Sequence, residues 1–188
     1  MTAENQPTPN RTRSRISLLL VAAMFLGSFG VAATLFFGGW KPTSTRNIGE
    51  MLSPYPDLRD VALVRADGQP WVWTPADRHW HIVVAPPADC GEPCAQLLNA
   101  LHRVWYSEGR HAEKLKVLWF GELPAGAPEF SGLEPMQPNA ALQGKLPDQA
   151  RADALPVYVA DPNGYLVLRY APGFNPSGLR KDLGRVLK

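Results

Sequence analysis

An uncharged apolar stretch near its start limits most strongly how this chain can fold. Residues 16–37 contain no charged side chain and are almost all apolar. As an α-helix that rises about 1.5 Å per residue, they would measure roughly 33 Å, enough to cross a hydrocarbon core about 30 Å thick. We therefore predict a single transmembrane helix over residues 16–40, which contacts the lipid bilayer through residues 16–37.

The residues that flank this stretch predict its orientation. Arg11, Arg13 and Arg15 stand immediately before it, and Trp40 stands at its other end. Positive charge favours the cytoplasmic side of a membrane, and tryptophan favours the interface. We expect residues 1–15 to form a cytoplasmic tail and the rest of the chain to be exported. This arrangement corresponds to a single-pass inner-membrane protein with a periplasmic C-terminal domain.

A cleaved signal peptide is the alternative for the same stretch. Val31-Ala32-Ala33 resembles a small-residue cleavage site. The apolar run, however, exceeds the usual signal-peptide core of about 7–15 residues and continues through Phe37. We favour the uncleaved anchor, and either interpretation exports the rest of the chain.

The charge balance excludes one class of partner. Before the apolar stretch, three arginines and one glutamate give +2, and from Lys41 onward 16 basic residues balance 16 acidic ones. The net charge of +2 therefore reflects membrane topology. With no basic stripe or aromatic platform, we expect no nucleic-acid partner.

The two cysteines lie close together, in Cys90-Gly91-Glu92-Pro93-Cys94. A strand-like run precedes them and a helix-like run follows, so both sulfurs should lie near a helix N-terminus. There, unpaired N–H groups and the helix dipole favour the thiolate, which attacks disulfides and binds soft metals. Three interpretations remain open: a redox-active or metal-binding dithiol, a structural disulfide, and coincidence.

We do not expect a zinc site. Structural zinc needs four ligands, and the chain has only two cysteines. We expect the four histidines to lie away from the pair, as surface or packing residues. They are His79, His81, His102 and His111.

The exported sequence alternates between strand and helix signals. Two apolar runs flank the turn Ala66-Asp67-Gly68-Gln69 and predict a hairpin. A strand, an amphipathic helix closed by Gly109 and a second strand then predict a parallel crossover unit. Asp161-Pro162-Asn163-Gly164 predicts a second hairpin, and Asn175-Pro176 begins a closing helix. The expected strands are residues 61–64, 71–73, 80–85, 115–120, 157–160 and 165–170.

This order predicts the α/β class: a thioredoxin-like domain with an added N-terminal β-hairpin, preceded by the single transmembrane helix. The domain should span residues 61–188, with residues 41–60, which are rich in proline and poor in apolar residues, as a tether. The five prolines of segment 122–154 exclude a long helix there, although residues 140–146 could form a short one.

One proline belongs to the expected site. Leu155-Pro156 precedes the strand at 157–160, and in this fold a proline at that point commonly takes the cis form and faces the cysteines. The alternative is a trans proline that opens a strand.

Together these features resemble the SCO/SenC branch of the thioredoxin superfamily, membrane-tethered proteins that assist copper insertion into cytochrome c oxidase. The shared features are the N-terminal span, the Cys90/Cys94 pair after a buried strand, segment 157–164 and the C-terminal helix. The resemblance covers roughly residues 61–188. It implies Cys90 and Cys94 as Cu(I) ligands, and an oxidase subunit or assembly factor as the partner. Segment 47–54 is also similar to small tethered thioredoxin-like proteins associated with oxidase assembly.

One position departs from that family. Its copper site also uses a histidine eight residues before the aspartate of the Asp-Pro turn, and here this residue is Asp153. A carboxylate is a poor replacement for imidazole at Cu(I). Met136 is a candidate for a further ligand.

A thiol–disulfide role needs only Cys90, Cys94 and Pro156, which are all present. Our first hypothesis is therefore an exported thiol–disulfide protein of oxidase assembly. In it Cys90, expected to be the more exposed, attacks, and Cys94 resolves. The alternatives are a Cu(I) carrier and a non-catalytic scaffold with a structural disulfide.

Overall fold

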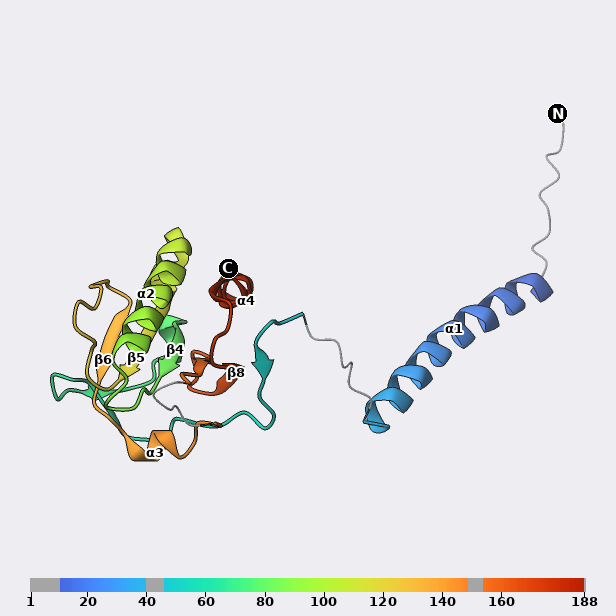
Figure 1. The fold of residues 1–188 in the computed structure, drawn as a ribbon. Helices are drawn as coiled ribbons and strands as arrows, with labels where there is room; N and C mark the ends of the chain where they lie inside the picture. Colours follow the sequence, from blue (N-terminus) through green and yellow to red (C-terminus); the bar gives the residue numbers. More distant parts are fainter. Residues whose placement is uncertain (1–10, 40–45, 149–153, 188) are drawn as a thin grey trace. The chain divides into compact units, whose positions relative to one another are not determined.

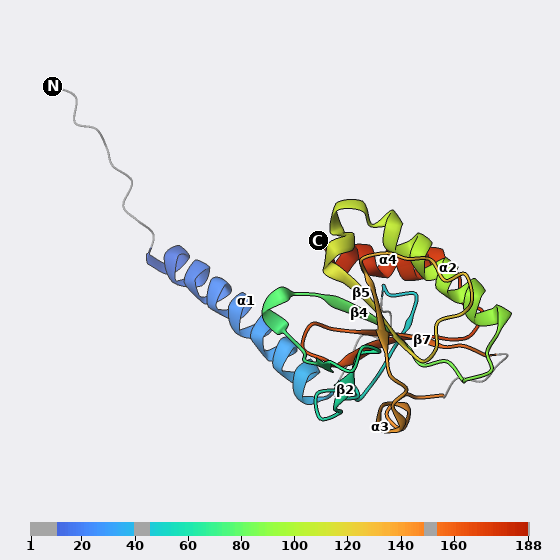
Figure 2. The same cartoon turned by 90° about the vertical axis from the view of Figure 1, so that its left-hand side faces the viewer.

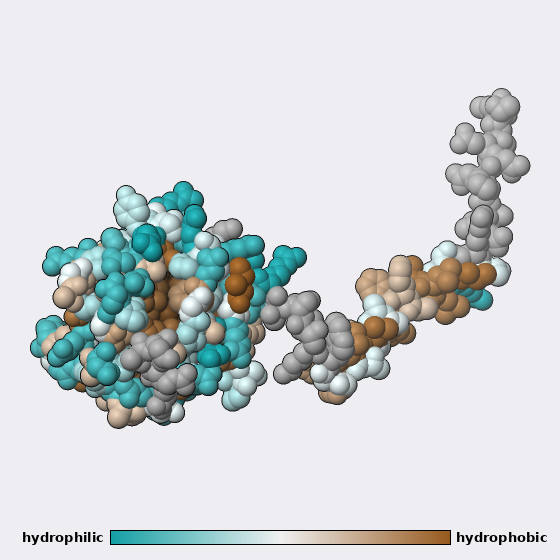
Figure 3. All heavy atoms as spheres, in the orientation of Figure 1, coloured by the Kyte–Doolittle hydropathy of each residue, from teal (hydrophilic) through white to brown (hydrophobic). Residues whose placement is uncertain are grey.

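The computed structural model describes residues 11–39, 46–148 and 154–187, and the chain divides into two compact units. The first unit contains α1 (Arg11–Phe37), within which Arg15–Phe37 is long and apolar enough to cross a membrane. Figure 3 shows the side chains of α1 largely in the hydrophobic colour. The predicted apolar helix is therefore present, and it begins a turn earlier than the apolar stretch.

The second unit is built on a mixed six-stranded sheet (Figure 1). Three adjacent strands that form one half of the sheet are parallel, and the other neighbouring pairs are antiparallel. The strand order is β1 (Glu50–Met51), β8 (Leu166–Tyr170), β7 (Val157–Ala160), β4 (Trp80–Val84), β5 (Leu115–Phe120) and β6 (Leu133–Met136).

The predicted crossover unit is confirmed. The chain leaves β4, forms α2 (Glu92–Ser107) and the 3-10 helix η2 (Gly109–Lys114), and returns as β5 parallel to β4. The closing helix α4 (Pro176–Val186) lies beside α2 on the same face of the sheet (Figure 2). The Asn175 side chain caps α4 by accepting a hydrogen bond from the Ser177 N–H, as Asn-Pro predicts.

Both faces of the sheet are buried, which explains the continuous apolar runs of its central strands. Successive side chains of a strand point to opposite faces. Ile82 and Val84 pack with α2 and α4 residues, whereas Val83 and Ala85 join a second cluster on the other face. The hairpin of β2 (Leu63–Val64) and β3 (Pro70–Trp71), η1 (Pro75–Asp77) and α3 (Ala140–Gln143) complete the domain. The predicted hairpin and the short helix are thus present.

The folded unit begins earlier than the sequence indicates. Residues 46–60, assigned to the tether, pack onto the domain: β1 pairs with β8, and Leu52 and Leu58 are buried. The buried Asp182 carboxylate accepts hydrogen bonds from the Ile48 and Gly49 N–H groups, at 2.7 and 2.9 Å. This attachment depends on contacts more than 130 residues apart, so a local proline count could not reveal it.

Strand β6 was also missed. Pro135 lies within it and lacks a backbone N–H, which normally argues against a strand. The strand is nevertheless compatible with proline because β6 lies at the edge of the six-stranded sheet, and its outer side forms only an isolated bridge between Met136 and Arg65.

Candidate functional site

The two cysteines form a disulfide at the start of α2. Their Cα atoms are 5.6 Å apart. Gly91 is the N-cap of α2, so Cys90 precedes the helix and Cys94 is its third residue. Both sulfurs therefore lie near the N-terminus of α2, as the sequence predicts, although Cys90 lies outside the helix. The chain turns back at Gly91, whose φ of 55° favours glycine.

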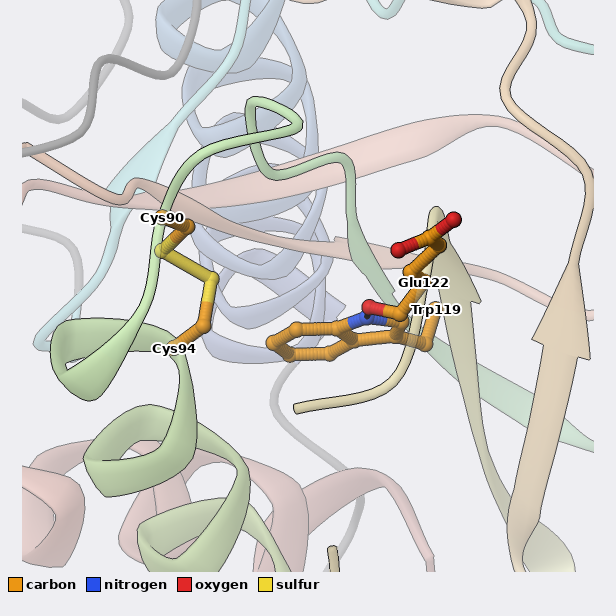
Figure 4. Close-up of a disulfide and its surroundings, with 4 residues drawn as sticks. All are labelled: Cys90, Cys94, Trp119 and Glu122. Carbon is orange, nitrogen blue, oxygen red and sulfur yellow. Dashed lines mark hydrogen bonds between the residues drawn. A yellow bond between two sulfur atoms is a disulfide. The ribbon is translucent and has the colours of Figure 1, made fainter. Parts of the chain in front are cut away.

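The disulfide rests on the buried core. Trp119, the fifth residue of β5, has no exposed surface and belongs to the same apolar cluster as both cysteines. Figure 4 shows an edge of its indole ring turned toward the disulfide. The indole N–H donates a hydrogen bond of 3.1 Å to the Glu122 carbonyl, which fixes the ring.

Both cysteines are nearly buried. Cys90 is 6% exposed and Cys94 is 4% exposed, so the expectation that Cys90 is the more exposed is not supported by a meaningful difference. The reason is that Cys90, although outside the helix, is held against the core by its bond to Cys94.

A pocket of about 600 Å³ opens beside the disulfide. Both cysteines line it, together with Pro86 and Pro87 from the end of β4 and the turn that follows β5, Gly121–Ala125. Parallel strands β4 and β5 end at the same edge of the sheet, with Val84 opposite Trp119. The site thus lies at the carboxyl ends of these strands, where α/β folds commonly bind ligands.

Trp119 and Glu122 were not singled out from the sequence. The signal that could have found them is topological: once β4 and β5 are paired in parallel, the turn after β5 must lie beside the cysteine turn after β4.

Pro156 does not have the cis peptide bond that we expected. The Leu155–Pro156 peptide bond is trans; among the described residues the cis bond precedes Pro54. Trans is the intrinsic preference of an X–Pro bond by about 0.5–1 kcal/mol, and the strand at Val157 begins without the cis isomer. Pro156 does not line the pocket, but Leu155 packs in the same cluster as both cysteines.

The other candidate ligands lie away from the disulfide or outside the description. Met136 is buried in the cluster on the opposite face of the sheet, and His102 stacks on Phe130 at 4.9 Å. Asp153 lies outside the described residues. Among residues 11–39, 46–148 and 154–187, no group of three or more His, Cys, Asp or Glu side chains could hold a metal.

His81 is buried between two tryptophans. Its ring meets those of Trp71 and Trp73 edge to face, at 5.7 and 4.8 Å between centroids. Burial lowers the pKa of His81 to about 4, and nearby His79 and Lys116 add to this effect. His81 is therefore neutral at pH 7 and packs the face opposite the disulfide, as expected for a packing residue.

Comparison with known proteins identifies the family. A family model described as "Transmembrane-like, thioredoxin-like, C-terminal domain" matches residues 80–188, more than half of the chain. The chain therefore belongs to this family. No curated protein sequence matches it.

Solved structures support the same fold. BsSco, described as a member of the Sco family of cytochrome c oxidase assembly proteins with a disulfide switch, has a TM-score of 0.54 and 12% identity; the match covers 74% of this chain and 97% of that one. A SCO1/SenC family lipoprotein from Bacillus anthracis str. Ames has a TM-score of 0.55 and 12% identity, and the match covers 73% of this chain and 99% of the lipoprotein chain. Trgpx, in its apo form, has a TM-score of 0.50 and 11% identity, and the match covers 70% of this chain and 95% of the Trgpx chain.

At such low identity these likenesses establish the fold. The predicted thioredoxin-like domain is confirmed, and so is its structural likeness to SCO/SenC proteins.

Proposed function

We propose that this chain is a membrane-anchored, exported thiol–disulfide protein that acts on cysteine pairs during cytochrome c oxidase assembly. One observation carries the chemistry: the Cys90–Cys94 disulfide lines a pocket of about 600 Å³ at the start of a helix. A disulfide that only pinned the loop would need no such opening, whereas exchange needs room for a second pair of sulfurs.

The exchange proceeds in two steps from the reduced chain. The Cys90 thiolate attacks one sulfur of the substrate disulfide; an S–S bond forms to Cys90, and the other substrate sulfur leaves as a thiolate and takes a proton. The Cys94 thiolate then attacks the Cys90 sulfur and releases the second substrate thiol. Two electrons pass to the substrate, the chain returns to the disulfide form, and a dithiol donor reduces it for the next cycle.

The roles of individual residues follow from their positions. Cys94 lies in the first turn of α2, where the helix dipole stabilises a thiolate. Cys90 precedes the helix, at the turn itself, and we assign it the attacking role. We keep Pro156 in the proposed site because Leu155, which precedes it, belongs to the same apolar cluster as both cysteines.

The link to oxidase assembly rests on likeness. BsSco is described as belonging to a family of cytochrome c oxidase assembly proteins, and the lipoprotein neighbour is also named SCO1/SenC. The partner would be an oxidase subunit or assembly factor, for example the cysteines of a copper-receiving subunit. The anchor and its preceding arginines support an inner-membrane location with the domain in the periplasm.

Exchange kinetics test this proposal. The reduced full chain, in an uncharged detergent, should become oxidised when mixed with a small disulfide. Cys90→Ser should abolish exchange, and Cys94→Ser should stop at a mixed disulfide that mass spectrometry detects. Retained exchange in Cys90→Ser would overturn the assignment of the attacking thiol.

Carriage of Cu(I) is the second candidate, favoured by the presence of both cysteines in the lining of one pocket. Two thiolates are soft ligands suited to Cu(I), which would be bound here as cargo. The test is a Cu(I) titration of the reduced chain against a competing chelator, beside the Cys90→Ser/Cys94→Ser form. Tight binding that requires the cysteines would support carriage, and equal binding by the two forms would exclude it.

A non-catalytic scaffold is the third candidate, favoured by the burial of both cysteines. It predicts that the double serine variant still supports oxidase assembly in cells. Lost oxidase activity with normal amounts of the variant protein would exclude it.

A further inference from the structure

We propose that the disulfide pocket selects positively charged cysteine-containing substrates through Glu92 and Glu122. This inference rests on the proposed exchange function and names the substrate class of that same site. Both glutamates line the pocket with the two cysteines, and no lysine or arginine of the described residues lines it.

The local charge contrasts with that of the domain as a whole. From Lys41 onward, acidic and basic residues are equal in number. The two segments that approach the disulfide are different: residues 79–102 contain Asp89 and Glu92 and no lysine or arginine, and residues 117–144 contain Glu122, Glu129 and Glu134 and no lysine or arginine. Neither of these two segments therefore brings a lysine or an arginine to the pocket.

The two pocket glutamates are accessible to an incoming ligand. Both side chains are exposed. Glu92 accepts a hydrogen bond of 3.1 Å from the uncharged Gln96 amide, and neither glutamate forms an ion pair with any residue that the structure describes. In contrast, Glu134 lies away from the pocket and is paired with Arg65 and Lys116.

The direction of selection follows from charge. Unpaired carboxylates beside a concave site raise the local concentration of cations and lower that of anions. A disulfide flanked by lysine or arginine should therefore reach the sulfurs faster than one flanked by carboxylates. Because both carboxylates are solvent-exposed, salt should weaken the preference.

The test compares three small disulfides that differ mainly in charge. They are cystamine, with two ammonium groups, bis(2-hydroxyethyl) disulfide, which is neutral, and dithiodipropionate, with two carboxylates. The reduced full chain, in an uncharged detergent at low ionic strength, is mixed with each, and remaining thiols are counted by alkylation and mass spectrometry. Each rate is divided by that of dithiothreitol with the same disulfide, because the three differ in intrinsic reactivity.

We expect cystamine to react about tenfold faster than dithiodipropionate after this correction, with the neutral disulfide between them. The ratio should fall toward one in high salt and in Glu92→Gln/Glu122→Gln. Glu129→Gln is the matched control, since Glu129 is an exposed carboxylate of the same loop that does not line the pocket, and it should keep the ratio.

The outcomes separate this inference from the function on which it rests. Absence of exchange with all three disulfides would overturn the proposed function. Exchange at equal corrected rates, or a preference that survives in the double variant, would overturn the role of Glu92 and Glu122 and leave the exchange function standing.

Discussion

Individual residues around the disulfide couple its redox state to the core. Trp119 is fully buried, is held by its hydrogen bond to the Glu122 carbonyl, and turns an edge of its ring toward the sulfurs. Reduction breaks the bond beside this ring. The indole is therefore positioned to report on the chemistry of the pair.

A disulfide beside an indole quenches its fluorescence, so we predict that reduction of the chain raises tryptophan emission. Trp119→Phe should remove most of this change. Trp71→Phe is the control, because Trp71 packs on the opposite face of the sheet. Emission spectra of the oxidised and reduced forms of each variant test this prediction. If reduction raised the emission of Trp119→Phe as much as that of the wild type, Trp119 would not be the tryptophan beside the disulfide.

His81 provides a prediction about pH. Burial lowers its folded-state pKa to about 4, below the ordinary value of 6.5, so the unfolded chain binds a proton that the folded chain does not. Stability should be complete above about pH 6.5 and fall as the pH drops toward 4, by at most about 3 kcal/mol from this group.

Unfolding midpoints of the wild type and His81→Gln between pH 7 and 4 test this effect. The wild type should lose more stability over that range than the variant does. His79→Gln serves as the comparison and should retain the wild-type slope. Parallel curves for the wild type and His81→Gln would refute the prediction.

At the level of elements, the segment that contains β1 is attached to the domain by a close backbone approach. A Cβ on Gly49 would lie 2.6 Å from the Tyr170 ring, which is buried and receives support from Asp182 through a hydrogen bond of 2.7 Å. The ring cannot retreat easily, so any side chain at Gly49 must displace β1 from β8.

We expect Gly49→Ala to destabilise the domain by about 1–3 kcal/mol. Gly144→Ala is the control, because a Cβ there meets only ordinary contacts at 3.6 Å or more. Thermal unfolding in detergent compares the two, and limited proteolysis should cut Gly49→Ala first near its displaced N-terminal segment. Equal stability of the two variants would contradict the attachment.

The sequence predicted the helices and strands whose signals are local. The crossover β4–α2–β5 and the hairpin of β7 and β8 follow from apolar runs, leucine spacing and the Asp-Pro-Asn-Gly turn. β1 and β6 were missed because two residues, or four that include a proline, carry no periodic signal. Their pairing is set by neighbours distant in the sequence.

The features of the site also divide into those that the sequence predicts and those that only the fold reveals. The sequence alone limits any disulfide within the chain to Cys90 and Cys94, because these are its only two cysteines. The pocket and its acidic lining depend on β5 ending beside β4. These features required the three-dimensional arrangement.

For the whole molecule, the proposed topology makes the apolar helix an anchor that places the folded unit outside the cytoplasm. Arg11, Arg13 and Arg15 precede the apolar helix, and the domain follows it. An alkaline phosphatase fused after Lys188 is active only outside the cytoplasm, so the fusion should be active in cells. Replacing the three arginines by glutamate should lower its activity several-fold, and an inactive wild-type fusion would contradict the exported topology.

The central claim is that Cys90 and Cys94 interconvert between dithiol and disulfide in the folded chain. The most direct measurement equilibrates the full-length protein in buffers of graded dithiothreitol redox potential, traps free thiols by alkylation and counts them by mass spectrometry. We predict a reversible two-electron curve, with circular dichroism unchanged across it. A disulfide that resists reduction until the domain unfolds would contradict the account and leave the pair with a structural role.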